Sequence, residues 1–329
     1  MTCDLNLNED QRQILGAASV MLEASYPVAR RRQRRPDDLA ELAAFGAFGL
    51  ALPQDGGEAG YSVVEEALLH VLLGRHVVST GALAASLAAR LAANTGRSDL
   101  ADGIVAGTTG VCAAIAAKDS ALLVERGEAS FALLFDGREL ALLDMDGIDA
   151  RPVESLGHGI PLQRIASGEA REIARSADDE LADTADLLIS AQLLGVAEAA
   201  RDLTVAYANM RQQFGQPIGG FQAIKHHCAN MAVGAEMASA QLDMAAIALR
   251  DRRADASFQV AALRHLAEKA AIFNTRTAVQ VHGGIGFSAE ADVHHYLKQA
   301  HLLSRLGAGA GLLAMPAPLA PHEALIRGE

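Results

Sequence analysis

The spacing of apolar residues divides the chain into three parts, and the first part follows the period of an α-helix. Over residues 8–23 the positions Ile14, Ala18 and Leu22 lie on one stripe, which predicts an amphipathic helix. A short extended run is expected at residues 49–53, where apolar residues end at a proline. Further helices are predicted over residues 36–47, 63–74, 80–94 and 100–105. Residues 1–109 are therefore expected to form an all-helical domain.

Between Gly110 and about Glu180 the pattern changes to short apolar runs separated by glycine and aspartate, as is typical of β-strands. Strands are expected at residues 111–117, 131–135, 140–143 and 162–165. We therefore predict that residues 110–180 form a small β-domain.

Four long stretches with wide apolar stripes complete the chain. They span residues 183–210, 221–250, 258–282 and 289–306. Such stretches predict long helices that pack as a bundle over residues 181–329. Because wide stripes on alanine-rich helices indicate burial on more than one side, we expect the bundle to take part in oligomerisation. The expected fold class is mainly α with a small β-domain.

A cluster of glycine and proline separates the first two of these long helices, at residues 215–220. Arg211 and Phe214 lie just before this break, and Gln222 lies just after it. A cation, an aromatic ring and an amide at one corner are suited to a ligand that carries both phosphate and ring systems.

Composition and charge exclude several classes of protein. Half of the 329 residues are apolar and only 4% are aromatic, which favours closely packed helices. The formal net charge of −12 argues against nucleic acid as a partner. Three cysteines without CxxC spacing predict reduced thiols. Acidic residues precede the first apolar run, so no signal peptide is expected, and no stretch reaches the ~18 apolar residues of a membrane span. These features favour a cytoplasmic location.

Two histidine pairs and one arginine run are candidate ligand sites. Adjacent helical residues point about 100° apart, so neither His226-His227 nor His294-His295 can chelate one ion, and no metal site is predicted. The RRRQRR run at residues 30–35 would suit an anionic partner such as the phosphates of coenzyme A. We favour a solvated surface, because charge runs between helices usually have that role.

Two motifs resemble the acyl-CoA dehydrogenase family. The first is an R-x-x-F-G-x-P-I-x-x-F-Q run over residues 211–222, which in that family joins two helices of the C-terminal domain. The second is a Q-x-x-G-G-x-G-F run over residues 280–287. The resemblance implies an N-terminal helical domain, a middle β-barrel that is reduced here, and a C-terminal four-helix bundle that forms a tetramer core. It also implies FAD as the cofactor.

In the resembled family these two motifs reach across to the FAD of a neighbouring subunit. By that resemblance Arg211 is expected to pair with the FAD pyrophosphate, and Phe214 to pack on the adenosine half. The amides of Gln222 and Gln280 are expected to form hydrogen bonds with FAD. The backbone N–H groups of two adjacent glycines are expected to approach it closely. These two residues are Gly283 and Gly284.

The chain departs from the family where the flavin ring, substrate and catalytic base would be held. The family's T-E-P-x-x-G-S-D and W-x-[ST] motifs are missing from the shortened middle domain. The catalytic glutamate of most members falls at Gly307, and that of a minority falls at Ala185. Asp186 is a weak candidate for the base, since its side chain is short and its helical face is shifted.

The sequence therefore resembles the shortened, non-catalytic small subunit of the α2β2 acyl-CoA dehydrogenases that desaturate steroid side-chain CoA thioesters. The implied partners are a full-length acyl-CoA dehydrogenase subunit, an acyl-CoA bound at the site of that subunit, and an electron acceptor. Two alternatives stay open. One is a self-sufficient homotetrameric dehydrogenase with a relocated base, and the other is a flavin-free structural homologue.

Overall fold

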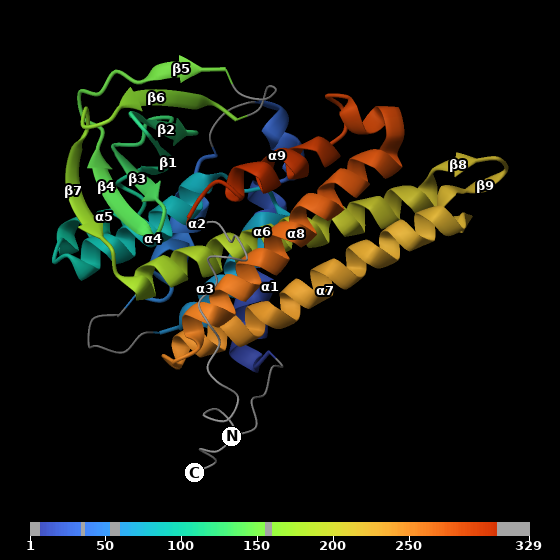
Figure 1. Cartoon of the computed structure of the whole chain (residues 1–329), viewed down its shortest axis with the longest axis horizontal. Coiled ribbons are helices and arrows are strands. Elements are labelled where there is room, and N and C mark those ends of the chain that lie inside the picture. Colours follow the sequence, from blue (N-terminus) through green and yellow to red (C-terminus); the bar gives the residue numbers. More distant parts are fainter. Residues whose placement is uncertain (1–6, 34–36, 53–59, 155–159, 308–329) are drawn as a thin grey trace, which may run out of the picture.

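In the computed structural model, residues 7–33, 37–52, 60–154 and 160–307 are described. A curled β-sheet lies at one end of the molecule and a bundle of long helices extends away from it (Figure 1). Shorter N-terminal helices pack against both parts. The division into domains at residues 109 and 180 stays a proposal.

The N-terminal part is helical, as predicted. Its helices are α1 (Glu9–Ser25), α2 (Ala40–Ala44), α3 (Val63–Arg75), α4 (Thr80–Asn94) and α5 (Ser98–Val105). The predicted extended run after α2 is wrong within the described residues, because Ala47–Gly49 forms a 3₁₀ turn and Leu50 has α-helical backbone angles. This compact turn keeps Phe48 in the core, with 3% of its surface exposed. Pro53 lies outside the described residues.

The middle of the chain forms a sheet in which the described strands run in the order β5-β6-β2-β1-β3-β4-β7. The strands are β1 (Val111–Ala117), β2 (Ser120–Val124), β3 (Phe131–Asp136), β4 (Glu139–Asp144), β5 (Arg151–Val153), β6 (Leu162–Ala166) and β7 (Arg171–Ser176). The sequence predicts four of them. It misses β2 because the turn before it has neither glycine nor proline. It misses β5 because that strand has three residues and contains a proline, and it misses β7 because three of its six residues are charged. Helix α4 packs against β1 and β3.

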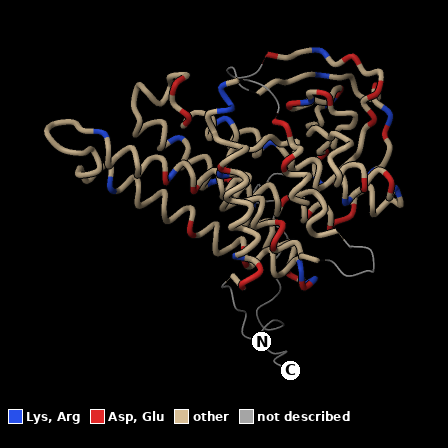
Figure 2. The backbone as a smooth tube through the Cα atoms, turned by 180° about the vertical axis from the view of Figure 1, so that it is seen from behind, with Lys and Arg blue, Asp and Glu red and all other residues tan. Residues whose placement is uncertain are grey.

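The four long helices predicted for the last part are confirmed as α6 (Asp179–Met210), α7 (Gln222–Arg250), α8 (Ala256–His282) and α9 (Val293–Leu303). Helices α6 and α7 run past the others to a short hairpin that projects away from the sheet (Figure 1). Charged residues gather around the sheet and the neighbouring helices, whereas the hairpin end is mostly uncharged (Figure 2).

The arginine run at residues 30–35 pairs with other parts of the chain. Arg31 lies 2.6 Å from Glu125, and their side chains are 2% and 0% exposed. Arg32 lies 2.8 Å from Asp292. The interpretation of this run as a solvated surface is therefore wrong for Arg31, whereas the side chain of Arg32 is 44% exposed and forms its ion pair at the surface. The last two arginines lie outside the described residues.

Burial of His70 between α3 and α6 predicts a pH-dependent stability. The imidazole is fully buried, and Nε2 of Gln192 lies 3.1 Å from its Nδ1. Burial lowers the pKa of His70 to about 3. The unfolded chain, with an ordinary histidine pKa, therefore binds a proton below about pH 6.5 that the folded chain does not. The contribution of His70 to the free energy of unfolding is therefore fully present above about pH 6.5 and is lost as the pH falls.

We expect the His70→Asn variant to lose less stability than the natural protein on acidification. One pKa unit corresponds to about 1.4 kcal/mol. The difference in the free energy of unfolding between the natural protein and the variant should therefore change by about 2 kcal/mol between pH 6.5 and 5. Urea unfolding at several pH values measures this change. If the two stability curves run parallel over that interval, the imidazole of the folded protein is not held neutral.

Candidate functional site

The corner between α6 and α7 is a tight hairpin. Arg211 follows the end of α6 in an extended conformation, and its carbonyl accepts a hydrogen bond of 2.8 Å from the backbone N–H of Ile218. Between them, β8 (Gln212–Gln213) pairs with β9 (Gln216–Pro217), and a 3₁₀ turn leads into α7. The backbone of the predicted corner is thus fixed by pairing within the hairpin.

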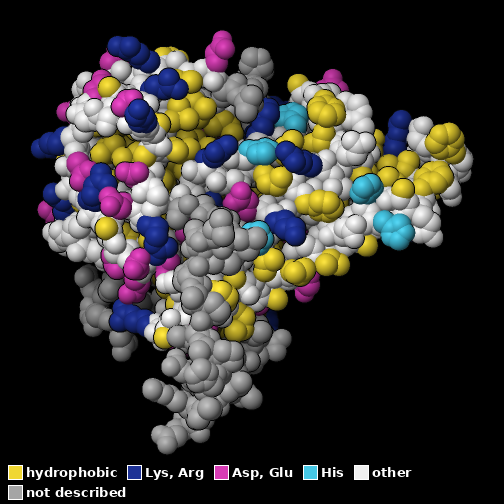
Figure 3. All heavy atoms as spheres, viewed as in Figure 1, with side chains coloured by type: hydrophobic (Ala, Val, Ile, Leu, Met, Phe, Trp, Pro, Cys, Tyr) yellow, Lys and Arg dark blue, Asp and Glu magenta, His cyan; other side chains and the backbone are white. Residues whose placement is uncertain are grey.

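Side chains at this corner point outward. Phe214 has a positive φ of 53° and is 92% exposed. Its ring meets Phe221 edge to face, with 6.1 Å between the ring centres. Arg211 and Gln222 are also exposed. Hydrophobic side chains gather at this end of the molecule (Figure 3). The three residues that the sequence singles out at the corner are therefore brought together on an open surface.

The second motif forms the turn that ends α8. Gly283 has a positive φ of 64° and begins the 3₁₀ turn Gly283–Phe287. Both Gly283 and Gly284 are exposed, and a Cβ added to either would meet no atom within 4 Å. Gln280, in the last turn of α8, is exposed as well. The backbone of this turn is open to a ligand.

The two motifs lie at the same end of the bundle. The ring of Tyr207, near the end of α6, stacks on His282 with 4.1 Å between the ring centres. The Tyr207 hydroxyl also donates to the carbonyl of His282 at 3.5 Å. His282 lies inside the second motif, which is the signal in the sequence for this pair. The stack places the corner beside the glycine turn.

One of the two positions expected for a catalytic glutamate, Gly307, lies against α6 next to the other. Gly307 has a positive φ of 72°, and a Cβ added there would overlap Oδ1 of Asp186. The same Cβ would lie 3.0 Å from Cδ1 of Ile189. Ala185 is buried, with 2% exposure. Gly307 thus lies beside the residue that follows Ala185 in the chain, and neither family position carries a glutamate.

Asp186 lies beside a buried cation. Asp186 is 7% exposed, and Arg264 is completely buried. Burial lowers the pKa of Arg264, whereas attraction to Asp186 and then to Glu268 raises it. The Arg264 guanidinium donates to the carbonyls of Leu303 and Leu306 at 3.1 and 2.9 Å. Arg264 therefore holds the end of α9 against α8, with Glu268 as an ion-pair partner at 4.0 Å and Asp186 as a further attracting charge.

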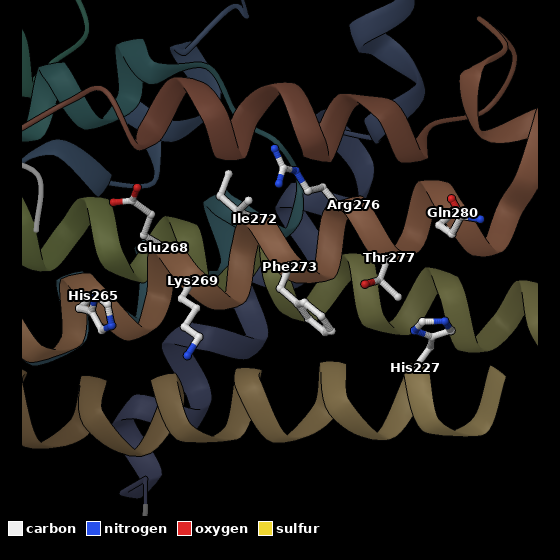
Figure 4. A pocket seen from close by; sticks show the side chains of 9 residues that line it. All are labelled: His227, His265, Glu268, Lys269, Ile272, Phe273, Arg276, Thr277 and Gln280. Carbon is white, nitrogen blue, oxygen red and sulfur yellow. The ribbon is translucent and has the colours of Figure 1, made fainter. Parts of the chain in front are cut away.

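A groove of about 740 Å³ runs along α8, and the sequence does not predict it. Its lining is shown in Figure 4 and comprises His227, His265, Glu268, Lys269, Ile272, Phe273, Arg276, Thr277 and Gln280. One end of the groove is Gln280, which lies in the last turn of α8 before the glycine turn. Among the described residues no group of three or more potential metal ligands occurs, and no described helix meets the length and hydropathy needed to span a membrane.

The sequence matches characterised families and proteins. Residues 183–311 match the acyl-CoA dehydrogenase C-terminal domain. The chain is 34% identical over 262 residues to the acyl-CoA dehydrogenase IpdE2 of Mycolicibacterium smegmatis, and this match covers 78% of each protein. It is 33% identical over 287 residues to the acyl-CoA dehydrogenase FadE34 of Mycobacterium tuberculosis, and this match covers 83% of the chain but 40% of that relative.

Solved structures share the fold. A variant of the Tcur3481-Tcur3483 steroid ACAD superposes with a TM-score of 0.78 at 24% identity, covering 93% of this chain and 96% of the other. The ChsE4-ChsE5 complex from Mycobacterium tuberculosis superposes with a TM-score of 0.77 at 21% identity, and the match covers 96% of this chain and 100% of the other. Butyryl-CoA dehydrogenase from Megasphaera elsdenii superposes with a TM-score of 0.75 at 21% identity, and the match covers 99% of this chain and 100% of the other. The fold class expected from the sequence, mainly α with a small β-domain, is confirmed.

Proposed function

The chain belongs to the acyl-CoA dehydrogenase family of FAD-dependent oxidoreductases, and we propose that it is a non-catalytic subunit that completes the FAD site of a catalytic partner. The observation that carries this proposal is the location of the two family motifs. They lie together at the end of the bundle that projects away from the chain's own sheet (Figure 1). A cofactor bound there would be contacted by a second chain.

The residues at this end suit one part of an FAD molecule. The Arg211 guanidinium would pair with the pyrophosphate, and the exposed face of Phe214 would pack on the adenosine half. The amides of Gln222 and Gln280 would form hydrogen bonds with it. The open backbone at the glycine turn, residues 283–284, leaves room for close approach and for N–H donation. When bound, FAD supplies the acceptor for the hydride removed from Cβ of an acyl-CoA.

The region where a base would act supports a non-catalytic role. Proton removal from Cα of a thioester needs a carboxylate that reaches the substrate. Gly307 and Ala185 have none, and Asp186 is buried, with 7% exposure, where its charge attracts the Arg264 guanidinium. The middle domain also lacks the family motifs that hold the flavin ring and the acyl chain. The base, the ring contacts and the acyl-CoA are therefore assigned to the partner.

Two comparisons favour a heteromeric assembly in steroid degradation. Two of the solved structures that share the fold are named for two components each, and one of them is a steroid ACAD. The match to FadE34 covers 83% of this chain and only 40% of that relative, which leaves room in the relative for a second, longer unit. We therefore propose a full-length acyl-CoA dehydrogenase subunit as partner, a steroid side-chain CoA thioester as substrate, an electron-transfer acceptor, and a cytoplasmic location.

Purification with and without a partner tests this proposal. We expect the chain alone to carry little or no flavin and to show no dehydrogenase activity. After co-expression with a full-length acyl-CoA dehydrogenase subunit from the same organism, the complex should contain stoichiometric FAD and should reduce an artificial electron acceptor with acyl-CoA. A yellow, active preparation of the chain alone would support the homotetrameric alternative. A colourless preparation with every candidate partner would support the flavin-free alternative.

A further inference from the structure

His282 is the last residue of α8 and comes directly before the glycine turn. Its half-buried ring is stacked on Tyr207 of α6, with 4.1 Å between the ring centres and an angle of 21° between the ring planes. Two nearly parallel rings at this distance are in contact over their faces. The stack therefore fixes the plane of the imidazole beside the backbone of Gly283.

A hydrogen bond within α8 fixes the tautomer of the same ring. Nδ1 of His282 lies 2.7 Å from the carbonyl oxygen of Ala278, one helical turn earlier. Because a carbonyl oxygen can only accept, Nδ1 carries the proton. In a neutral imidazole the other nitrogen, Nε2, then has a free lone pair and acts as an acceptor. Nε2 forms no hydrogen bond with any described residue, and it is not among the buried unpartnered atoms of that part of the chain. It is therefore open at the surface.

The imidazole of His282 is neutral at pH 7. Burial lowers its pKa, and the hydrogen bond to Ala278 opposes this shift as the smaller effect. Tyr207 faces the ring from α6, and no charged group among the described residues contributes to the shift. Since an ordinary histidine has a pKa of about 6.5, Nε2 is an acceptor at neutral pH and becomes a donor only at lower pH.

This acceptor complements the donors at the same end of the bundle. The Arg211 guanidinium and backbone N–H groups only donate, so they suit phosphate oxygens, which only accept. The hydroxyl groups and the adenine amino group of a dinucleotide are donors, and they need an acceptor from the protein. An imidazole held in one plane and one tautomer provides such an acceptor without a net charge that would have to be desolvated.

We propose that His282 is a further cofactor-binding residue, whose Nε2 accepts a hydrogen bond from a hydroxyl or amino group of FAD. The inference rests on the proposed function, because it requires FAD to be bound at this end of the bundle. Tyr207 is then a positioning residue, since it orients the imidazole through the stack.

Two amide substitutions test the proposal in the complex co-expressed with a full-length acyl-CoA dehydrogenase subunit. Both remove the ring and its stack. The amide of His282→Asn can still donate to Ala278 but does not reach the position of Nε2, whereas the longer side chain of His282→Gln places its amide oxygen there. We expect His282→Asn to raise the Kd for FAD about five- to tenfold, as for one lost hydrogen bond, and His282→Gln to recover most of that loss.

The matched control is His265→Asn, which removes an imidazole from the same helix about 25 Å away. It should leave the Kd for FAD unchanged. Flavin fluorescence on dilution measures FAD release, and size-exclusion chromatography checks that each variant assembles with the partner subunit.

A pH series provides a second readout. The Kd for FAD of the natural complex should rise as the pH falls below about 6.5, because protonated Nε2 no longer accepts. His282→Gln should lack this rise. The difference between the two profiles separates His282 from His226 and His227, which are near the start of α7 and are present in both proteins.

Three results decide the outcome. Equal Kd values for the natural complex and His282→Asn would overturn the inference, and so would equal losses in the asparagine and glutamine variants with parallel pH profiles, which would indicate packing alone. If Arg211→Ala loses FAD while His282→Asn retains it, the proposed function stands and this inference fails. A complex that contains no FAD would overturn the proposed function and this inference with it.

Discussion

Replacing Arg211 with alanine is expected to weaken FAD retention by the complex ten- to a hundredfold. Loss of a charge-assisted hydrogen bond is worth about 1.5–3 kcal/mol, which gives that range of affinity. Arg211 is exposed at the corner, and its side chain forms no ion pair with any described residue. We therefore expect the Arg211 guanidinium to bind a group outside this chain. FAD release during dilution, followed by flavin fluorescence, measures the effect.

The matched control for this prediction is Arg12→Ala, which removes an exposed arginine from α1. It should leave both FAD retention and assembly unchanged. The stability of the isolated chain should be the same for the natural protein and for Arg211→Ala, because the guanidinium has no described partner to lose. Equal FAD retention by the natural complex and by Arg211→Ala would contradict the assignment of the corner to the cofactor.

Replacing Asp186 with asparagine is expected to destabilise the fold by about 3 kcal/mol without changing kcat of the complex. Arg264 is completely buried and is attracted first to Asp186 and then to Glu268, so the variant leaves a buried cation with Glu268, at 4.0 Å, as its remaining counter-ion. The destabilisation should appear in urea unfolding of the isolated chain. The kcat of the co-expressed complex should be unchanged, because the base is assigned to the partner.

A double variant separates the structural role from a catalytic one. Adding Arg264→Met to Asp186→Asn removes both charges and should recover part of the lost stability, since a buried ion pair can be replaced by apolar groups at little cost. The opposite pattern would be a fall in kcat of about a hundredfold or more with unchanged stability, which is the loss typical of removing a general base. That result would favour the self-sufficient dehydrogenase.

Local sequence signals predict those elements whose stability is decided locally. Helix α4 begins at Thr80 and ends at Asn94, as the apolar spacing predicts. The strand β2 was missed, because a two-residue turn without glycine or proline gives no signal. The sequence predicts an extended run at residues 49–53, but Ala47–Gly49 forms a 3₁₀ turn that buries Phe48 and Leu50 has α-helical backbone angles, because burial of the phenylalanine outweighs the local preference. Tertiary packing decided both exceptions.

The candidate site was only partly accessible from the sequence. The corner and the glycine turn are visible as motifs, and the structure adds that a stack between Tyr207 and His282 joins them. The groove on α8 was not predicted, since the open face of a helix depends on how it packs against α6, α7 and α9. The proximity of Gly307 to Asp186 likewise follows from the way α9 returns to α6. Such relations are set by the packed bundle and not by sequence spacing.

The most direct test of the account is a structure of the FAD-bound complex with its catalytic subunit. We predict that the isoalloxazine ring lies in the β-domain of the partner and that the Arg211 guanidinium lies within hydrogen-bonding distance of the FAD pyrophosphate. The account is contradicted by a flavin ring bound in this chain's own β-domain with a carboxylate of this chain directed at the thioester.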